Sequence, residues 1–325
     1  MEVWALRRIG VVTAGGDAPG MNAAIRAIVR SAIYNRLEVI GFERGYAGLI
    51  DGQARRLGPR SVSGIINLGG TILKTVRCER MKTQEGLEKA SETLKEYKID
   101  GLVVIGGDGT FRGGSRLYRV SGVPIVGVPA TIDNDVAGTD TTIGFDTAVN
   151  TAIYAIDRIR DTATSHERIF VVEVMGRNRG FLALEVGLAE GAEIILVPEV
   201  KFNLEEICDR LKHAYKKGKT SEIIVMAEGA GDSRSIVDYI KKETKYEVRL
   251  TVLGHIQRGG SPTARSRLLA CLFGNYAVEL LLSGVKKRMV GIRGKDITSV
   301  DLDYSWSETK ELDLRLYRLA QILSA

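Results

Sequence analysis

The chain has 325 residues, of which 44% are hydrophobic, 26% charged and 6% aromatic, and its formal net charge is +6. This composition excludes a disordered or collagen-like chain, and the length predicts two lobes. The absence of any run of about 18 apolar residues predicts no membrane span, and scattered basic residues do not indicate a nucleic-acid binder. Cys78, Cys208 and Cys271 are far apart without metal-binding spacing, which favours the cytoplasm.

Short apolar runs bounded by glycine recur along the chain, and stretches with helical spacing separate them. Strands are predicted at residues 9–13, 37–42, 101–105, 123–128, 169–174, 193–197, 222–227 and 248–252, the first of them buried. Helices are predicted at residues 21–34, 86–97, 111–118 and 145–160. This alternation predicts an α/β protein with two lobes, each a largely parallel sheet flanked by helices.

Two glycine-rich turns each follow a predicted strand and precede a helix. They are Thr13-Ala-Gly-Gly-Asp-Ala-Pro-Gly-Met-Asn22 and Ile105-Gly-Gly-Asp-Gly-Thr110. Backbone N–H groups at a helix start attract phosphate, and glycine allows phosphate to approach the backbone. Asp108, at the end of a parallel strand, is suited to hold Mg²⁺ beside phosphates. The alternatives are a structural turn for the first segment and a helix cap for Asp108.

A third motif, Pro129-Ala-Thr-Ile-Asp-Asn-Asp135, follows another apolar strand. In an extended segment Asp133 and Asp135 would point the same way. One carboxylate could then take a proton from a substrate hydroxyl while the other lies near a cation. The alternative is a polar loop with Asx turns.

Basic residues form the last motif, because arginines stand at the ends of several predicted strands. Each one alone is typical of a surface residue, but together they favour a phosphate and sugar pocket, since arginine binds phosphate bidentately. They lie in Met175-Gly-Arg177, in Gly254-His-Ile-Gln-Arg258-Gly-Gly and at Arg77, Arg168 and Arg249. A lysine group indicates either a solvated helix end or an anion site; it comprises Lys212, Lys216, Lys217 and Lys219.

Taken together and in this order, the motifs resemble those of the phosphofructokinase family, in particular its bacterial ATP-dependent members. The resemblance runs from about Ile9 to about Gly291. It implies transfer of the γ-phosphoryl group of ATP to the 1-hydroxyl of fructose 6-phosphate, the committed step of glycolysis. It further implies Mg²⁺ with ATP and a homotetramer whose active sites are shared between subunits.

Roles carried over with the motifs are implied by this resemblance. Asp133 would be the general base, Arg177 and Arg77 would neutralise the transferring group, and Asp108 would hold Mg²⁺. The ATP site would comprise Gly15, Arg77, Cys78, Gly107, Asp108, Gly109 and Thr110. The fructose 6-phosphate site would comprise Thr131, Ile132, Asp133, Met175, Gly176, Arg177, Glu228, His255, Ile256, Gln257 and Arg258, with Arg168 and Arg249 from a neighbouring subunit.

The phosphoryl donor depends on two small residues. Pyrophosphate-using relatives typically carry Asp where this chain has Gly109, and Lys where it has Ala130. A carboxylate at the first position would repel the α-phosphate of ATP, so ATP is favoured over pyrophosphate. Ala130 in place of the commoner Gly and the charge of Lys74 are departures from the ATP-dependent pattern.

The resemblance also implies regulation by ADP or phosphoenolpyruvate at a second, intersubunit site. Two departures weaken the match, because Pro59 replaces a common arginine and Ser221 a common histidine. The positions that correspond to this effector site are Arg26, Arg30, Arg160, Gly191, Glu193, Lys217, Lys219 and Ser221.

The order of the motifs predicts the lobes. Residues 1–142 plus 251–300 would bind the nucleotide, and residues 143–250 plus 301–325 the sugar phosphate. From Asp301 onward the chain is predicted to form an amphipathic helix that packs on the second lobe; its apolar residues are Leu312, Leu314, Leu316, Leu319 and Ile322.

Three other functions fit part of this pattern. A pyrophosphate-dependent phosphofructokinase is the nearest. NAD and diacylglycerol kinases share Gly-Gly-Asp-Gly-Thr but lack the later His-Ile-Gln-Arg-Gly-Gly segment. A non-catalytic sugar-phosphate sensor would be expected to have lost Asp108 or Asp133, and both are present.

Overall fold

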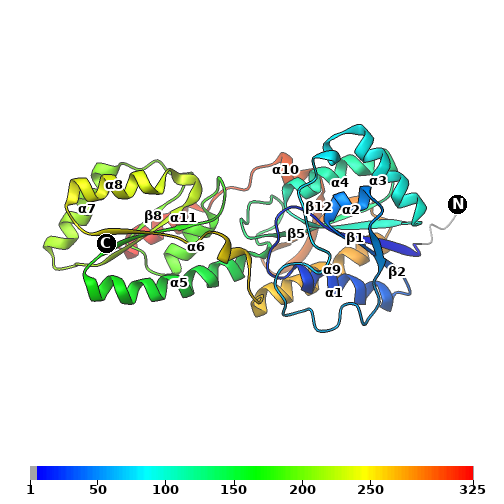
Figure 1. Cartoon of the computed structure of the whole chain (residues 1–325), viewed down its shortest axis with the longest axis horizontal. Coiled ribbons are helices and arrows are strands. Elements are labelled where there is room, and N and C mark those ends of the chain that lie inside the picture. Colours follow the sequence, from blue (N-terminus) through cyan, green and yellow to red (C-terminus); the bar gives the residue numbers. More distant parts are fainter. Residues whose placement is uncertain (1–5, 325) are drawn as a thin grey trace. The chain divides into compact units, whose positions relative to one another are not determined.

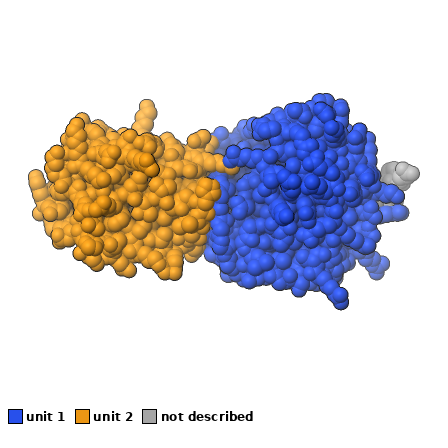
Figure 2. Space-filling view, viewed as in Figure 1, with its two compact units in different colours: residues 1–147, 258–310 blue, residues 148–257, 311–325 orange. Residues whose placement is uncertain are grey.

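The computed structural model describes residues 6–324 and divides into two compact units (Figure 2). Unit 1 comprises residues 1–147 and 258–310, and unit 2 comprises residues 148–257 and 311–325. The divisions fall somewhat later along the chain than the boundaries expected from the sequence. Strand pairing explains two of these differences, because Ile143 pairs with Ala130 and Asp301 with Arg288, which keeps both segments in unit 1.

Unit 1 is built on an eight-stranded sheet in the order β12-β11-β5-β4-β1-β2-β3, with β6 pairing beside β5. The central strands are parallel, as predicted, whereas the edge strands β3 and β12 run antiparallel. The strands are β1 (Arg8–Thr13), β2 (Glu38–Phe42), β3 (Ala54–Arg56), β4 (Gly101–Gly106), β5 (Ile125–Thr131), β6 (Ile143–Gly144), β11 (Lys287–Arg293) and β12 (Asp296–Asp301).

Helices cover both faces of this sheet (Figure 1). One face carries α1 (Met21–Tyr34) and α9 (Ala264–Leu282), and these helices approach closely because a Cβ at Gly274 would lie 2.7 Å from Ala27 Cβ. The other face carries α2 (Gly45–Ile50), α3 (Gln84–Glu96) and α4 (Asp108–Ser121), with the short helices η1 (Glu79–Lys82) and α10 (Tyr304–Ser307).

Unit 2 has a four-stranded, entirely parallel sheet in the order β10-β7-β9-β8. Its strands are β7 (Ile169–Val174), β8 (Ile194–Leu196), β9 (Glu222–Ala227) and β10 (Val248–Val252). The helices α7 (Leu204–Lys216) and α8 (Ser233–Thr244) pack together, and α5 (Phe145–His166) and α6 (Phe181–Ala189) lie on the opposite face (Figure 1). Two short helices, η2 (Glu228–Ala230) and η3 (Gly254–Arg258), follow β9 and β10.

The tail differs from the single helix predicted from residue 301 onward. Asp301 ends β12, α10 follows, and the amphipathic helix α11 spans only Leu314–Leu323. It packs on α6, and Tyr317 Oη donates a hydrogen bond to the Ile195 carbonyl at 3.3 Å, so this helix does join the second unit. Among residues 6–324 no helix is long and apolar enough to cross a membrane.

Candidate functional site

The carboxyl edge of the unit 1 sheet brings three predicted motifs together. Strands β1, β4 and β5 are adjacent and parallel, with Thr13 opposite Ile105 and Gly106 opposite Pro129. Because parallel strands end at the same edge, the segments that follow them emerge side by side. We call this group, Gly15, Gly107–Thr110 and Thr131–Asp133, the unit 1 cluster.

Hydrogen bonds hold the two glycine-rich turns against each other. Thr110 Oγ1 donates to the Ala14 carbonyl at 2.8 Å. A Cβ at Gly106 would lie 2.3 Å from both the Ala14 carbonyl oxygen and Thr110 Oγ1, so only glycine fits there. Gly15 has a φ of +87°, a backbone conformation that glycine adopts without strain. Gly106 is therefore required by the packing of the turns, and Gly15 by its backbone conformation.

The start of α4 has free space beside it. Gly107 is the N-cap and Asp108 the first helical residue, so Asp108 is not the helix cap considered above. Gly109 is exposed, and a Cβ there would meet no atom within 4 Å. The described residues contain no group of three His, Cys, Asp or Glu side chains able to hold a metal. A Mg²⁺ ion at Asp108 fits this setting, because Mg²⁺ commonly takes one carboxylate together with phosphate and water ligands.

Asp133 lies in a buried loop directly after β5. The residue is 1% exposed, and its Oδ2 accepts a hydrogen bond from Thr131 Oγ1 at 3.3 Å. Asn134 has a φ of +52°, so the chain is not extended here. The expectation that Asp133 and Asp135 point the same way therefore does not apply, and Asp135 is the more exposed of the two.

Arg77 and Cys78 lie in the segment before η1. Arg77 is exposed, and Thr75, two residues earlier, donates a hydrogen bond from Oγ1 to the Gly15 carbonyl at 2.8 Å. This contact ties the segment to the first glycine-rich turn. The sequence pattern did not indicate Thr75, because a single threonine in a loop carries no recognisable signal.

Arg258 lies against the same turn. Its Nη1 donates to the Asp17 carbonyl at 3.4 Å and would lie 2.4 Å from a Cβ at Gly16. The residues before it belong to unit 2, where His255 and Ile256 are exposed. Gln257 is fully buried and donates to the Gly254 carbonyl at 3.1 Å, so its side chain is engaged in the turn.

A second group, the unit 2 cluster, comprises Met175–Arg177 and Glu228 at the carboxyl ends of β7 and β9, which are adjacent and parallel. Glu228 Oε1 accepts hydrogen bonds from the backbone N–H groups of Gly176 at 3.2 Å and Arg177 at 2.6 Å. Arg177 is exposed and left-handed, with a φ of +54°. Glu228 therefore stabilises the loop that presents the Arg177 side chain.

Arg168 and Arg249 lie at the opposite, amino edge of this sheet. Arg168 precedes β7, and Arg249 is the second residue of β10. Both pair with Glu247, with 2.9 Å between Arg168 Nε and Glu247 Oε2, and these guanidinium groups, Arg168 first, lower the pKa of Glu247. Strand β7, which has 6 residues, separates the two edges and spans about 20 Å at a rise of about 3.3 Å per residue. One chain therefore does not bring these arginines together with Arg177.

The positions matched to an effector site divide between the units. Arg26 and Arg30 are on α1, while the others are in unit 2. There Glu193 Oε1 pairs with Lys219 Nζ at 2.8 Å, and its Oε2 accepts the Ile223 N–H at 2.7 Å. Arg160 Nη2 donates to the Glu190 carbonyl at 2.6 Å, beside Gly191, which has a φ of +60°. Lys217 is exposed at the end of α7, and Ser221 is partly buried.

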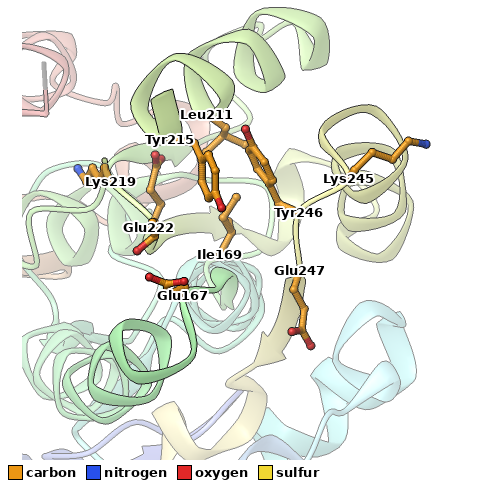
Figure 3. A pocket seen from close by; sticks show the side chains of 10 residues that line it. Glu167, Ile169, Leu211, Tyr215, Lys219, Glu222, Lys245, Tyr246 and Glu247 are labelled. Carbon is orange, nitrogen blue, oxygen red and sulfur yellow. The ribbon is translucent and has the colours of Figure 1, made fainter. Parts of the chain in front are cut away.

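An open cavity of about 180 Å³ lies within unit 2 (Figure 3). Tyr215 and Tyr246 stack across part of its wall with ring centroids 4.4 Å apart, while the Lys245 ammonium group points away. The lining comprises Glu167, Ile169, Leu211, Tyr215, Lys219, Thr220, Glu222, Lys245, Tyr246 and Glu247. It thus joins Lys219 of the effector positions to Glu247, the partner of Arg168 and Arg249.

Glu222 is the buried acid of this cavity, with 4% of its surface exposed. Burial, followed by the neighbouring carboxylate of Glu193, raises the pKa of Glu222 to about 7, although Lys219 and Arg210 oppose the shift. The charge of this cavity therefore changes near neutral pH. The sequence analysis did not single out this residue, because burial of a carboxylate is decided by tertiary packing.

Known proteins resemble this chain over nearly its full length. The sequence model of the phosphofructokinase family matches residues 8–281. The ATP-dependent 6-phosphofructokinase of Halothermothrix orenii is 52% identical over 331 residues, which cover 98% of this chain and 100% of that protein. The chain belongs to the phosphofructokinase family. This confirms the resemblance seen in the motifs.

Solved structures agree with the fold. The phosphofructokinase of Saccharomyces cerevisiae matches with a TM-score of 0.87 and 33% identity, covering 98% of this chain and 48% of that one, so this chain spans about half its length. A pyrophosphate-dependent phosphofructokinase from Marinobacter aquaeolei matches over 95% of this chain and 86% of that one, with a TM-score of 0.85 and 22% identity. That similarity shows the fold alone, so the fold does not separate the two phosphoryl donors.

The raised pKa of Glu222 predicts a pH-dependent stability. Between an ordinary value of 4.5 and about 7 the folded protein keeps a proton that the unfolded chain releases, so this contribution to stability is lost as the pH rises. Glu222→Gln lacks this titration. As the pH rises from about 5 to about 8, its free energy of unfolding should therefore increase relative to that of the parent, by at most about 3 kcal/mol. Urea unfolding at several pH values measures this. Exposed Glu206→Gln is the control, and parallel pH profiles for parent and Glu222→Gln would contradict the assignment.

Proposed function

We propose that this protein transfers the γ-phosphoryl group of ATP to the 1-hydroxyl of fructose 6-phosphate, giving fructose 1,6-bisphosphate and ADP. The observation that carries the proposal is the unit 1 cluster, in which two glycine-rich turns and buried Asp133 follow adjacent parallel strands. The nearly full-length similarity to a relative named as an ATP-dependent 6-phosphofructokinase supports the same conclusion.

Asp133 is proposed as the general base. It accepts the proton of the sugar hydroxyl as that oxygen bonds to the γ-phosphorus, while the bond between this phosphorus and the β–γ bridging oxygen breaks and ADP leaves. The hydrogen bond from Thr131 Oγ1 at 3.3 Å orients one carboxylate oxygen. Such a reaction needs alignment and charge neutralisation more than covalent assistance from the protein.

The nucleotide is proposed to bind at Gly15 and at the start of α4, residues 107–110, with Arg77 and Cys78 beside it. Backbone N–H groups at a helix start suit phosphate oxygens. Asp108 would hold the Mg²⁺ ion that accompanies ATP. When bound, that ion neutralises charge on the phosphates.

The sugar phosphate is proposed to bind through Arg177, whose loop is stabilised by Glu228. Met175, Gly176, Thr131, Ile132 and residues 255–258 would complete the site. The exposure of Arg177 and His255 agrees with a role in binding a ligand.

A homotetramer with shared active sites completes the proposal. Arg168 and Arg249 lie at the opposite sheet edge from Arg177, so they suit the sugar phosphate of a neighbouring subunit better than that of their own. ADP or phosphoenolpyruvate would bind at the effector positions, and the three scattered cysteines favour a cytoplasmic location.

Removal of the proposed base tests the reaction. In Asp133→Ser we expect turnover with ATP and fructose 6-phosphate to fall by about 10²–10⁴-fold, with substrate affinities within a few fold of the parent, because a positioned base contributes about that much. A coupled assay of ADP release measures it, and exposed Asp161→Ser is the control. Near-normal turnover in Asp133→Ser would refute the assignment of the base.

The choice of donor is tested at Gly109, where a side chain has room. Gly109→Asp adds a carboxylate beside the proposed phosphate site, and like charges at about 4 Å cost roughly 4 kcal/mol at an effective dielectric constant of about 20. ATP-dependent kcat/KM should fall by about a hundredfold to a thousandfold, whereas Gly109→Ala should stay close to the parent. Assays with ATP and with pyrophosphate measure it. If the parent uses pyrophosphate and not ATP, the alternative donor holds.

The shared site is tested by mixing variants. Arg249→Ala should weaken fructose 6-phosphate far more than ATP, while exposed Arg234→Ala should behave as the parent. Hetero-oligomers of Arg249→Ala and Asp133→Ser subunits should regain activity, because some sites then combine an intact base with an intact neighbouring arginine. Absence of any recovery in verified hetero-oligomers would count against sharing.

A further inference from the structure

Lys310 reaches the loop that carries Asp133 from a distant part of the chain. Its Nζ donates hydrogen bonds to Asn134 Oδ1 and to the Asp140 carbonyl, each at 2.9 Å. The lysine lies in the tail after α10 and is the last residue of unit 1 before the chain enters unit 2. The loop and Lys310 both belong to unit 1.

Asn134 is the immediate neighbour of Asp133 and has an unusual backbone conformation. Its φ of +52° lies in the left-handed region, which is uncommon for residues other than glycine and is maintained by surrounding contacts. The Asn134 side chain is buried, and Thr142 Oγ1 contacts the same Oδ1 at 3.4 Å. The lysine bond is much the shorter of the two and is charge-assisted, so it is the stronger restraint on Asn134.

The rest of the loop is held to the sheet. Thr142 Oγ1 donates to the Thr131 carbonyl at 2.7 Å, and the Asp140 N–H donates to the Ile292 carbonyl at 2.8 Å. The two ends of this loop are bonded to each other, because Asn134 Nδ2 donates a hydrogen bond to the Asp140 carbonyl at 3.3 Å. Lys310 adds a shorter, charge-assisted link between the same two residues. Without Lys310, the turn between Asp133 and Asp140 keeps its sheet anchors and the longer bond between Asn134 and Asp140, but it loses the short, charge-assisted bond to the Asn134 side chain next to Asp133.

We propose that Lys310 is a positioning residue for the reaction, which fixes the Asp133 carboxylate by holding Asn134 in its left-handed conformation. The inference rests on the proposed role of Asp133 as the base. Lys310 is not assigned contact with either substrate. Because transfer depends on accurate alignment of the base, a small displacement of Asp133 is expected to lower turnover more than binding.

The test compares Lys310→Met, which keeps the length of the side chain without its charge or donors, with Lys310→Arg and with exposed Lys286→Met. Lys310→Met should lower kcat by about ten- to a hundredfold with KM values for ATP and fructose 6-phosphate within about threefold. Lys310→Arg keeps a cationic donor and should recover most of the loss. Lys286→Met should match the parent. Circular dichroism and oligomeric state establish that each variant is folded, and Lys310→Gln replaces Lys310→Met if the latter does not fold.

A second comparison separates positioning from general destabilisation. If Lys310 acts through Asp133, then Lys310→Met should have almost no further effect in an Asp133→Ser background. Two results with an active parent would overturn this inference and leave the proposed function intact. One is that Lys310→Met is as active as Lys286→Met. The other is that the losses of Lys310→Met and Asp133→Ser multiply fully in the double variant. A parent without activity towards ATP and fructose 6-phosphate would overturn both.

Discussion

Parallel hydrogen bonding between β1, β4 and β5 is the constraint on which the candidate chemistry depends. It places the ends of three strands, at Thr13, Gly106 and Thr131, at one sheet edge. The Thr110–Ala14 bond and the space that only glycine can occupy at Gly106 then fix the two turns against each other. A shift of one residue in the β4–β5 register would move Asp108 relative to Asp133, and a shift in the β1–β4 register would break the Thr110–Ala14 bond.

Hydrogen bonds from distant side chains hold two of the loops that follow the strands. Each of these loops contains a residue with a left-handed backbone conformation. It is Asn134 in the loop that carries Asp133, and Arg177 in the loop that follows β7. In each case a side chain from a distant segment forms a hydrogen bond with that residue. Lys310 donates to the Asn134 side chain, and Glu228 accepts from the Arg177 N–H. Strained loops of this kind persist where the surrounding structure over-determines them, which is typical of sites that must present a group accurately.

The two edges of the unit 2 sheet carry different charged groups. The carboxyl edge presents Arg177, whereas the amino edge holds Arg168 and Arg249 on Glu247, close to a cavity whose acid, Glu222, titrates near neutral pH. The two arginines of the amino edge share the carboxylate of Glu247.

The sequence by itself determined the family, the α/β class and most strand positions, because β1 and β4 contain continuous apolar runs that are typical of buried strands. It also indicated Asp108, Asp133 and Arg177, since glycine-rich turns carry a local signal. Only the tertiary structure decided the antiparallel edges β3 and β12, the shortened tail helix and the contacts of Lys310, Thr75 and Glu222. These depend on which distant segments pack together, and a buried bond or a shifted pKa arises from that packing rather than from the residue type.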